Sequence, residues 1–439
     1  MTRARSSIVH KVHRSQLSLN RRLRRWLAKE LKGLRGVIAL SATRCRAEYY
    51  RKHFGSFSHA SLLLFHGLSG GASLRQSFAA FAACEGLVSL SGLMATDASG
   101  QDELGVSFSQ FAASNTSRPA EFLGGIIPYL VKRVRHREGR MNGHIPANLR
   151  MLDTTFLAIS LKLAPWVKVR GHVAGVQLQV EYVPALDLPE HVLLTDSHAN
   201  DYNRLDEAIM KQPARLVALR GQTLVVDLGY YSHRRFECLS NAGVHWLSRL
   251  NKQATVHVHQ KLPLPQTLPL LDTGRITILK HQVITLGSPN NRAGAVLQNV
   301  RRVTARVEPH PKAAKQGDKP VVYDLVTDRW DLDTIEVVQA YVWRWQIEIF
   351  FRWLKSHVHL TRWLGYSANA VALTVYLAIV IHLLCALVTR DLGLRQRTPA
   401  LLRQMAWSLA QLTSDDIPQE MEARQLTFPG WMAKQLVPT

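Results

Sequence analysis

The chain has 439 residues, of which 46% are hydrophobic and 20% charged, a composition that excludes an intrinsically disordered protein. Its length is sufficient for two or three domains. Because 55 Lys and Arg residues outnumber 32 Asp and Glu residues, the net charge of +23 favours a polyanionic partner, either nucleic acid or an anionic membrane surface.

Residues 1–52 are strongly basic and carry +13 of the net charge. In the segment NRRLRRWLAKELKGLR, Leu and Trp recur among the bases at near-helical spacing. This pattern predicts a basic amphipathic helix that lies on DNA or on a membrane, although a solvated basic face has the same pattern. If the helix contacts DNA phosphates, deleting residues 1–52 should weaken DNA binding and flatten its salt dependence.

Residues 56–140 contain short segments rich in Ala, Leu, Phe and Ser, which predict helices. The stretch GVSFSQFAASNTSRPAEFLGGIIPYL predicts two helices around a polar turn, with Pro119 near the first position of the second helix. A helix-turn-helix DNA reader and an ordinary helical hairpin both fit this pattern.

The four cysteines lie far apart without a CxxC pair, which argues against a disulfide framework or a cysteine zinc site and favours a reducing cytoplasm.

From about residue 148 the hydrophobic period changes to that of strands. The segments RMLDTTFLAIS, VQLQVEYV, HVLLTD, TLVVD and HWLSRL predict strands, and DYNRLDEAIMKQ predicts a helix between the third and the fourth of them. Strands followed by alternating strands and helices indicate the α/β class.

Residues 252–320 interrupt this alternation with the strand-like segments ATVHVHQKL, RITILKHQVITL and RRVTARVE. They predict a β-rich insertion, after which VVYDLVTD resumes the α/β pattern. His257 and His259 would share one face of a strand, a spacing that suits a metal, but two surface residues on an alternating strand are favoured because no other ligand type clusters nearby.

A long helix is predicted from about Asp333 to His357, and it includes the segment YVWRWQIEIFFRWLK. On a helix of 3.6 residues per turn, five residues with polar tips share a face about 80° wide. We call this face the basic stripe, and it consists of Tyr341, Arg344, Glu348, Arg352 and Lys355. Its neighbours are Trp, Phe, Ile and Leu, so most of the helix is expected to be buried.

The basic stripe carries three bases for a single acid. Pairs from Glu348 to Arg344 and to Arg352 would contribute about 0.2–0.5 kcal/mol each if exposed, and they do not account for three bases. Positive charge in an apolar setting is costly unless an anion approaches. The pattern therefore predicts that the stripe binds phosphates while Glu348 holds a cation against a nucleic-acid backbone.

A hard divalent cation requires more than one carboxylate. Asp153 within RMLDTT and Asp227 at the end of LVVD are candidates, because two strand-borne Asp residues beside a helix-borne Glu can hold two Mg²⁺ ions for in-line phosphoryl transfer. Asp196 also follows an apolar strand but runs into the polar loop SHAND, where a turn or helix-capping role is favoured.

The segment from Ala368 to Val388 is apolar and about long enough to span a bilayer. It contains Asn369, Thr374 and His382, and the other apolar stretches are far shorter. A helix buried inside a large domain is therefore favoured, and no membrane partner is expected.

The spacing of Tyr341, Arg344, Glu348 and Lys355 is that of the Tyr-Arg-Glu-Lys signature. With this signature the chain resembles the cut-and-paste DDE transposases of bacterial insertion sequences (family four) over most of its length. This four-residue signature is specific for the family.

Two further motifs carry the resemblance. LDTT at Asp153 is similar to the family's first-aspartate motif, which is usually Asp-Gly-Thr and from which Thr154 departs. VVDLGYYS is similar to the second-aspartate motif, with Asp227, Gly229 and Tyr230 matching.

The resemblance implies an RNase H-like catalytic core, a mixed sheet flanked by helices, interrupted by the β-rich insertion. It also implies that Asp153, Asp227 and Glu348 are catalytic and hold two Mg²⁺ ions, for which Mn²⁺ can substitute. The DNA-binding residues that it implies are Tyr341, Arg344 and Lys355. The reaction would be cleavage at insertion-sequence ends followed by strand transfer into target DNA.

The resemblance further implies DNA partners, namely the terminal inverted repeats and the target. It implies that two chains pair as a homodimer on DNA, and that the protein is cytoplasmic and associated with the nucleoid. The expected division is a basic helical region (1–55), a helical DNA-binding domain (56–145), the first part of the core (146–251), the insertion (252–320), the second part of the core (321–395) and a helical tail (396–439). Two alternatives stay open: an RNase H-like nuclease without transposition activity and a basic membrane-associated protein.

Overall fold

The chain folds into two compact units, and its two ends build the same one. The first unit comprises residues 1–139 and 352–439, and the second comprises residues 140–351. The computed structural model describes residues 2–48, 54–70, 72–96, 102–137, 144–170, 173–196, 206–265, 268–270, 274–288, 295–308, 319–394 and 399–417. The segment expected as the second part of the core (321–395) is thus divided, because its residues 352–395 belong to the first unit together with most of the amino-terminal helical segments and the tail.

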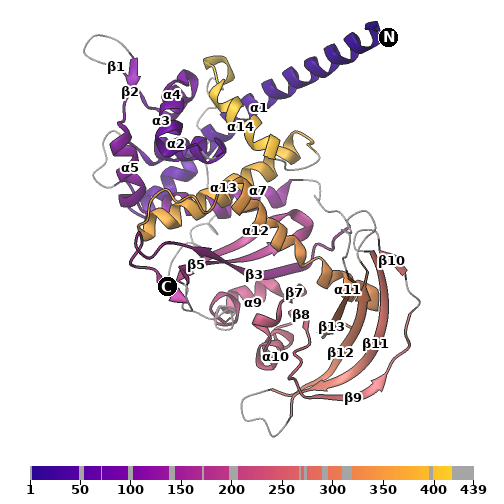
Figure 1. Cartoon of the computed structure of the whole chain (residues 1–439). Coiled ribbons are helices and arrows are strands. Elements are labelled where there is room, and N and C mark those ends of the chain that lie inside the picture. Colours follow the sequence, from indigo (N-terminus) through magenta and orange to yellow (C-terminus); the bar gives the residue numbers. More distant parts are fainter. Residues whose placement is uncertain are drawn as a thin grey trace. The chain divides into compact units, whose positions relative to one another are not determined.

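The second unit is built on a mixed sheet, which in the described part of the chain has 11 strands (Figure 1). Its strands are β3 (Leu149–Ala158), β4 (Lys168–Arg170), β5 (Val173–Val183), β6 (Leu188–Asp196), β7 (Thr223–Val226), β8 (His245–Arg249), β9 (Val256–Lys261), β10 (Leu268–Leu270), β11 (Gly274–Leu286), β12 (Leu297–Val307) and β13 (Val321–Thr327). The mixed α/β class expected from the sequence is confirmed.

The order of the strands divides the sheet into two parts. In the first part, β6, β5 and β3 are antiparallel neighbours, and β7 and β8 follow β3 in parallel. In the second part, β13 pairs with β8 and continues through β12 to β11, all antiparallel. The strand-like segments of residues 252–320 are therefore strands that extend the same sheet beyond β13.

Two short helices and a large aromatic pair form the core beside β7 and β8. The helices are α9 (Pro213–Leu219) and α10 (His233–Asn241). Phe236 of α10 stacks on Trp246 of β8 with ring centroids 4.1 Å apart, and both side chains are buried. The helix predicted within residues 201–212 is described only from residue 206, where Asp206–Met210 form one π-helical turn.

The prediction of one long helix from Asp333 to His357 is wrong in one respect, because this segment forms two helices. Helix α11 (Thr334–Val342) begins at the capping residue Asp333, and α12 (Trp345–His357) follows after a break. At the break the Arg344 N–H donates to the Tyr341 carbonyl, a three-residue spacing in place of the α-helical four. The segment YVWRWQ contains no Gly or Pro, so the sequence carries no signal for this break.

The described residues of the first unit are mainly helical and include a two-stranded hairpin of β1 (Met94–Thr96) and β2 (Asp102–Leu104). Its helices are α1 (Thr2–Arg44), α2 (Ser56–Leu68), α3 (Leu74–Ala82), α4 (Glu85–Ser91), α5 (Phe108–Ser117), α6 (Glu121–Gly124), α7 (Ile127–His136), α13 (Ala368–Asp391) and α14 (Pro399–Ala410). Pro119 lies two residues before α6, near its start as predicted.

Helix α1 confirms the predicted basic helix but also contributes to the core. Leu23, Leu27, Leu31 and Leu34 recur every three or four residues and are all buried. The Trp26 indole N–H donates to the Asp391 carboxylate at 2.9 Å, which joins α1 to the end of α13. Deleting residues 1–52 would therefore remove part of this core, so it would not isolate the contribution of the basic charges to DNA binding.

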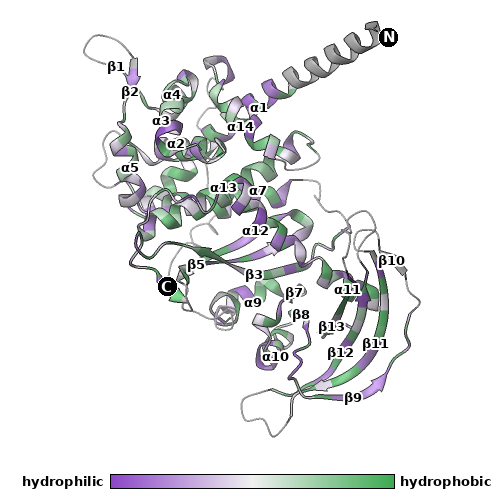
Figure 2. Cartoon of the chain, in the orientation of Figure 1, coloured by the Kyte–Doolittle hydropathy of each residue, from purple (hydrophilic) through white to green (hydrophobic). Residues whose placement is uncertain are grey.

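Helix α13 is the buried core helix that the sequence favoured. It is long and apolar enough to cross a membrane, but 89% of its most apolar stretch is buried inside the protein, and it packs against α2, α5, α6 and α7 of the same unit. Its hydrophobic character is evident in Figure 2. The half-buried Asn369 amide near its start donates to the Arg118 carbonyl at 2.7 Å and accepts from the Ala120 N–H at 2.8 Å, so this polar group is satisfied.

Candidate active site

Three polar residues lie side by side where β3, β7 and β8 run in parallel. Leu152 is opposite Val226 in the β3–β7 pair, so Asp153 and Asp227, the next residue of each strand, are neighbours. Parallel strands are about 4.8 Å apart, and side chains at the same level point to the same face of the sheet. The sheet register therefore brings together the two aspartates that the sequence singled out.

Arg249 is the third of these residues, and sequence reasoning missed it. Val225 is opposite Leu247 in the β7–β8 pair, which places Arg249 at the level of Asp227. Its positive charge acts on Tyr341 and lowers the pKa of that phenol, against the larger effect of burial. In the sequence, Arg249 is visible only as an Arg near the end of the predicted strand HWLSRL. Its place beside Asp227 cannot be inferred without the strand register.

Arg344 joins the strand-borne and helix-borne acids. Its Nη2 donates to Glu348 Oε1 at 2.8 Å, and its Nη1 lies 3.4 Å from Asp153 Oδ2. The side chain of Arg344 is only 12% exposed, compared with 21% for Asp153 and 30% for Glu348. The break before α12 places Arg344 in a turn, from which its guanidinium contacts both acids.

Tyr341 completes the contacts around Asp227. Its hydroxyl donates to Asp227 Oδ1 at 3.1 Å, and the side chain is buried. Burial raises the pKa of Tyr341, and the Asp227 charge raises it further, so the phenol keeps its proton and acts as a hydrogen-bond donor. In this arrangement Tyr341 orients a carboxylate.

The two aspartate motifs are also linked through their neighbours. The Thr154 N–H donates to Asp153 Oδ1 at 2.8 Å, and the Thr154 hydroxyl is 2.6 Å from the Tyr230 hydroxyl. Thr154, the residue that departs from the usual Asp-Gly-Thr pattern, thus bonds to Tyr230 of the second motif. This hydrogen bond fixes the backbone beside Asp153.

Arg352 and Lys355, the other two residues of the basic stripe, do not lie on a charged face within a buried helix as predicted. Arg352 is exposed, so its charge is solvated and does not require an anion. Lys355 is half-buried on the part of α12 that belongs to the first unit, and burial lowers its pKa below the ordinary value. Of the stripe, Tyr341, Arg344 and Glu348 meet the aspartates within the second unit.

Asp153, Asp227 and Glu348 carry the carboxylate oxygens that Mg²⁺ prefers as ligands. The negative charges of Asp227 and Glu348 both act on Asp153. Within the described ranges, however, no group of three His, Cys, Asp or Glu side chains is positioned around a single point as metal ligands would be. The Arg344 guanidinium lies between Asp153 and Glu348, and its buried Nε has no hydrogen-bond partner among the described residues. The oxygens of Asp153 and Glu348 suit a divalent cation chemically, and in this structure the Arg344 cation pairs with them.

The histidine pair and the competing aspartate lie elsewhere. His257 and His259 are exposed on β9, and the His259 Nε2 lies 2.6 Å from the Thr285 hydroxyl, as expected for surface residues. Asp196 is the last residue of β6, on the far side of β5 from Asp153.

Asp153 has the shifted acidity expected of a buried carboxylate. Burial raises its pKa to about 6, against the lowering effects of the Thr154 N–H and the Arg344 charge. Between the ordinary pKa of 3.8 and about 6, the folded protein keeps a proton that the unfolded chain has lost. The contribution of this group to stability is therefore largest at low pH and falls as the pH rises through that window.

We therefore expect the metal-free protein and its Asp153→Asn variant to differ in a pH-dependent way. The unfolding temperature of the wild type minus that of the variant should fall as the pH rises from about 4 to about 6, since the amide does not titrate. Thermal unfolding in a chelator at several pH values measures this difference. A difference that stays constant over the window would contradict the raised pKa.

Comparison with known proteins adds independent information. Residues 148–384 match the family model described as the transposase DDE domain. A transposase of Sinorhizobium fredii is 26% identical over 283 residues, which are 64% of this chain and 70% of that protein. A transposase for an insertion sequence element of Geobacillus stearothermophilus is 22% identical over 266 residues, 61% of this chain and 63% of that protein.

Among solved structures, a synaptic complex of piggyBac transposase with hairpin DNA is similar at 9% sequence identity. The match has a TM-score of 0.42 and covers 94% of this chain and 85% of that one.

Proposed function

Because the chain belongs to the transposase DDE domain family, we propose that it cuts DNA at the ends of an insertion sequence and joins those ends to target DNA. The observation that carries this proposal is the placement of Asp153 and Asp227 at one level of the sheet, with Arg344 between Asp153 and the helix-borne Glu348. Three carboxylates and a buried cation suit phosphoryl transfer on a polyanionic substrate.

The proposal includes an RNase H-like core and the family-four type with its Tyr-Arg-Glu-Lys signature. In support, β6, β5 and β3 are antiparallel and β7 and β8 continue in parallel, so Asp153 lies on the central strand of these five. The strands from β9 to β12 lie between Asp227 and Glu348 in sequence, where the β-rich insertion is proposed.

Each of the residues has a distinct proposed role. Asp153, Asp227 and Glu348 hold Mg²⁺ or Mn²⁺ ions, which when bound supply activation of water or a DNA 3′-hydroxyl and stabilisation of the leaving oxygen. Tyr341 keeps Asp227 in one orientation through its hydrogen bond. Arg344 changes partners: it bridges Asp153 and Glu348 in the free protein, and it binds a DNA phosphate when the carboxylates become ligands.

The partners proposed for the chain are the terminal inverted repeats of its element and the target DNA. Lys355 would bind a phosphate near the cut end, and two chains would pair the two ends as a homodimer. The excess of bases, +23 in total, supplies the long-range attraction that such binding requires.

Linear DNA that carries the element's terminal repeats tests the proposal. We expect the purified chain to cleave this DNA at the repeat boundary in Mg²⁺, to join the freed 3′ end to a plasmid target, and to do neither in a chelator. Cleavage without joining would favour the nuclease alternative, and equal cutting of DNA without repeats would contradict end recognition.

Exposed bases on α1 provide a sharper test of DNA contact than a deletion. Arg21, Arg22, Arg25 and Lys29 are exposed, while the leucines between them form core contacts. We expect the fourfold change to Gln to leave the unit folded and to weaken DNA binding. The log–log salt slope should fall by about 0.9 for each DNA phosphate that the variant no longer neutralises.

Fluorescence anisotropy at several salt concentrations measures the slope, and thermal unfolding checks the fold of the variant. A slope equal to that of the wild type would show that this face of α1 is a solvated surface.

A further inference from the structure

A cavity of about 450 Å³ lies inside the first unit. One wall comes from the end of α2 and the start of α3, and the other from the loop after α12 and the middle of α13. Its volume is within the range of roughly 300–1,000 Å³ typical of small-molecule sites, and it exceeds what a bare phosphate fills. The proposed roles of the carboxylates in the second unit make no use of this cavity.

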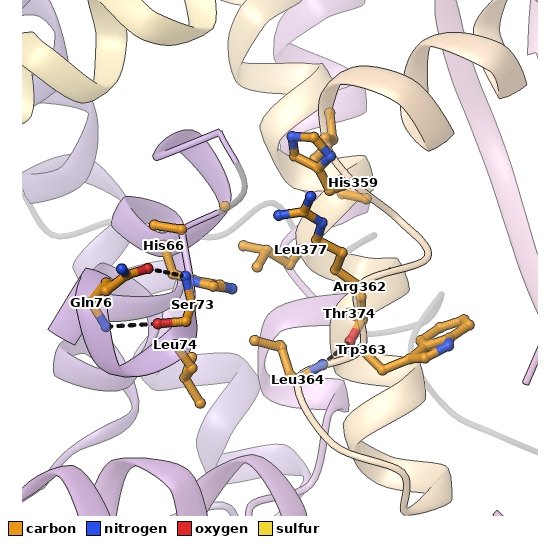
Figure 3. A pocket seen from close by; sticks show the side chains of 14 residues that line it. His66, Ser73, Leu74, Gln76, His359, Arg362, Trp363, Leu364, Thr374 and Leu377 are labelled. Carbon is orange, nitrogen blue, oxygen red and sulfur yellow. Dashed lines mark hydrogen bonds between the residues drawn. The ribbon is translucent and has the colours of Figure 1, made fainter. Parts of the chain in front are cut away.

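The two walls of the cavity carry different polar groups. Figure 3 shows His359 and Arg362 on one wall, with Arg362 directed into the space, and His66, Ser73 and Gln76 on the opposite wall. None of the described residues that line the cavity is an Asp or a Glu. The electrostatics therefore favour an anion.

The backbone at His359 is unusual. This residue has a φ of +54°, in the left-handed region that residues other than Gly rarely adopt. Its carbonyl accepts from the Arg362 N–H at 2.7 Å, a tight turn that places both side chains on the cavity. Strained backbone of this kind concentrates at ligand sites, where the surrounding structure maintains it.

The two histidines of the cavity are neutral hydrogen-bonding groups and add no positive charge. Burial lowers the pKa of His359, and the Arg362 charge lowers it further, against its hydrogen bond to the Gly70 backbone. Burial lowers the pKa of His66 to about 4, so this imidazole is neutral and can donate or accept, with Nδ1 2.9 Å from the Ser77 hydroxyl. The positive end of α3 adds partial charge on the same side.

Apolar groups form the remaining surface of the cavity. Val358, Leu364, Leu377 and Ala378 line it together with the polar residues. A site that combines one Arg, neutral hydrogen-bonding groups and an apolar surface suits a ligand with a phosphate at one end and a flat, weakly polar ring at the other. A nucleotide has this chemistry, whereas a DNA duplex is too wide to enter.

We propose that this cavity binds one unpaired nucleotide of the DNA substrate, with its phosphate on Arg362 and its base against the apolar side chains. This inference rests on the proposed function, because the DNA substrate of that function is the source of the nucleotide. A free mononucleotide has the same chemistry, so the test separates the two sources.

Binding is measured in a chelator, where no cleavage occurs, on the full chain. The probes are a blunt duplex, the same duplex with one unpaired 2-aminopurine nucleotide at its end, and free dAMP. We expect the wild type to bind the overhang about tenfold more tightly than the blunt duplex, with a change in 2-aminopurine fluorescence. Millimolar dAMP should compete only for this extra affinity.

Arg362→Gln should abolish the preference for the overhang, and Arg362→Lys should retain part of it. The control is Arg44→Gln, which removes the same charge from an exposed residue of the same unit that does not line the cavity. This control should affect both duplexes equally. Thermal unfolding of each variant verifies that the unit remains folded.

Equal affinity for the two duplexes, or a preference that Arg362→Gln leaves unchanged, would overturn the inference. Binding of dAMP without any overhang preference would overturn the DNA source in favour of a free nucleotide. If the wild type binds none of the duplexes, the proposed function itself fails. If Mg²⁺-dependent cleavage occurs while the overhang preference is absent, only the inference fails.

Discussion

Replacement of Glu348 by Gln is expected to abolish Mg²⁺-dependent DNA cleavage while DNA binding persists. Gln has the shape of Glu and keeps an oxygen for the 2.8 Å contact with Arg344, but it removes the negative charge that a metal ligand supplies. The cleavage rate should fall by at least about a thousandfold, which corresponds to about 4 kcal/mol of activation free energy. Gel assays of cleavage and of DNA binding on the same preparation measure the two effects.

The matched control for this change is Glu237→Gln. Glu237 is exposed on α10 in the same unit, so its replacement removes the same charge away from the aspartates. The control should cleave at the rate of the wild type. If Glu348→Gln also cleaved at that rate, the metal-ligand role of Glu348 would be wrong.

The second large effect is expected at Asp153. Asp153→Ala should eliminate cleavage, since it removes the carboxylate beside Asp227 that the sheet register holds in place. Burial raises the pKa of Asp153, so the loss of this carboxylate should leave folding intact, and inactivity would report a chemical role. A residual rate below about one thousandth of wild type is expected.

Asp196→Ala is the comparison that makes this result specific. Asp196 ends β6, which pairs with β5 and not with β3, so its replacement should leave most of the activity. Both variants are assayed on intact and pre-nicked ends, in Mg²⁺ and in Mn²⁺. An inactive Asp196→Ala with an active Asp153→Ala would require a different assignment of the catalytic core.

The strands around the aspartates could be predicted because alternation of apolar and polar residues is a local property. β3, β5, β6, β7, β8, β11, β12 and β13 each lie within or overlap a segment that the sequence identified. The proximity of Asp153 to Asp227 depends on which strands pair, so local alternation does not predict it; it was expected from the carboxylates that a cation requires and from the family resemblance.

Other features depend on partners that are distant in sequence. Arg249 was missed because its place beside Asp227 follows from the β7–β8 register. The core role of α1 was missed because α1 packs against α14, more than 300 residues away in sequence, as well as against the nearby α2 and α6. The bridge from Arg344 to Asp153 was missed because it requires the helix break after Val342.

The construction of the first unit from residues 1–139 and 352–439 has a consequence for synthesis on the ribosome. Helices α2, α5, α6 and α7 bury their apolar side chains against α13, which is translated more than 200 residues after α7. The amino-terminal helices therefore lack their central packing partner until translation has passed Asp391. A nonsense mutation or frameshift in the second unit would leave an incomplete amino-terminal fragment prone to degradation, and not a folded domain that competes with the intact protein for DNA.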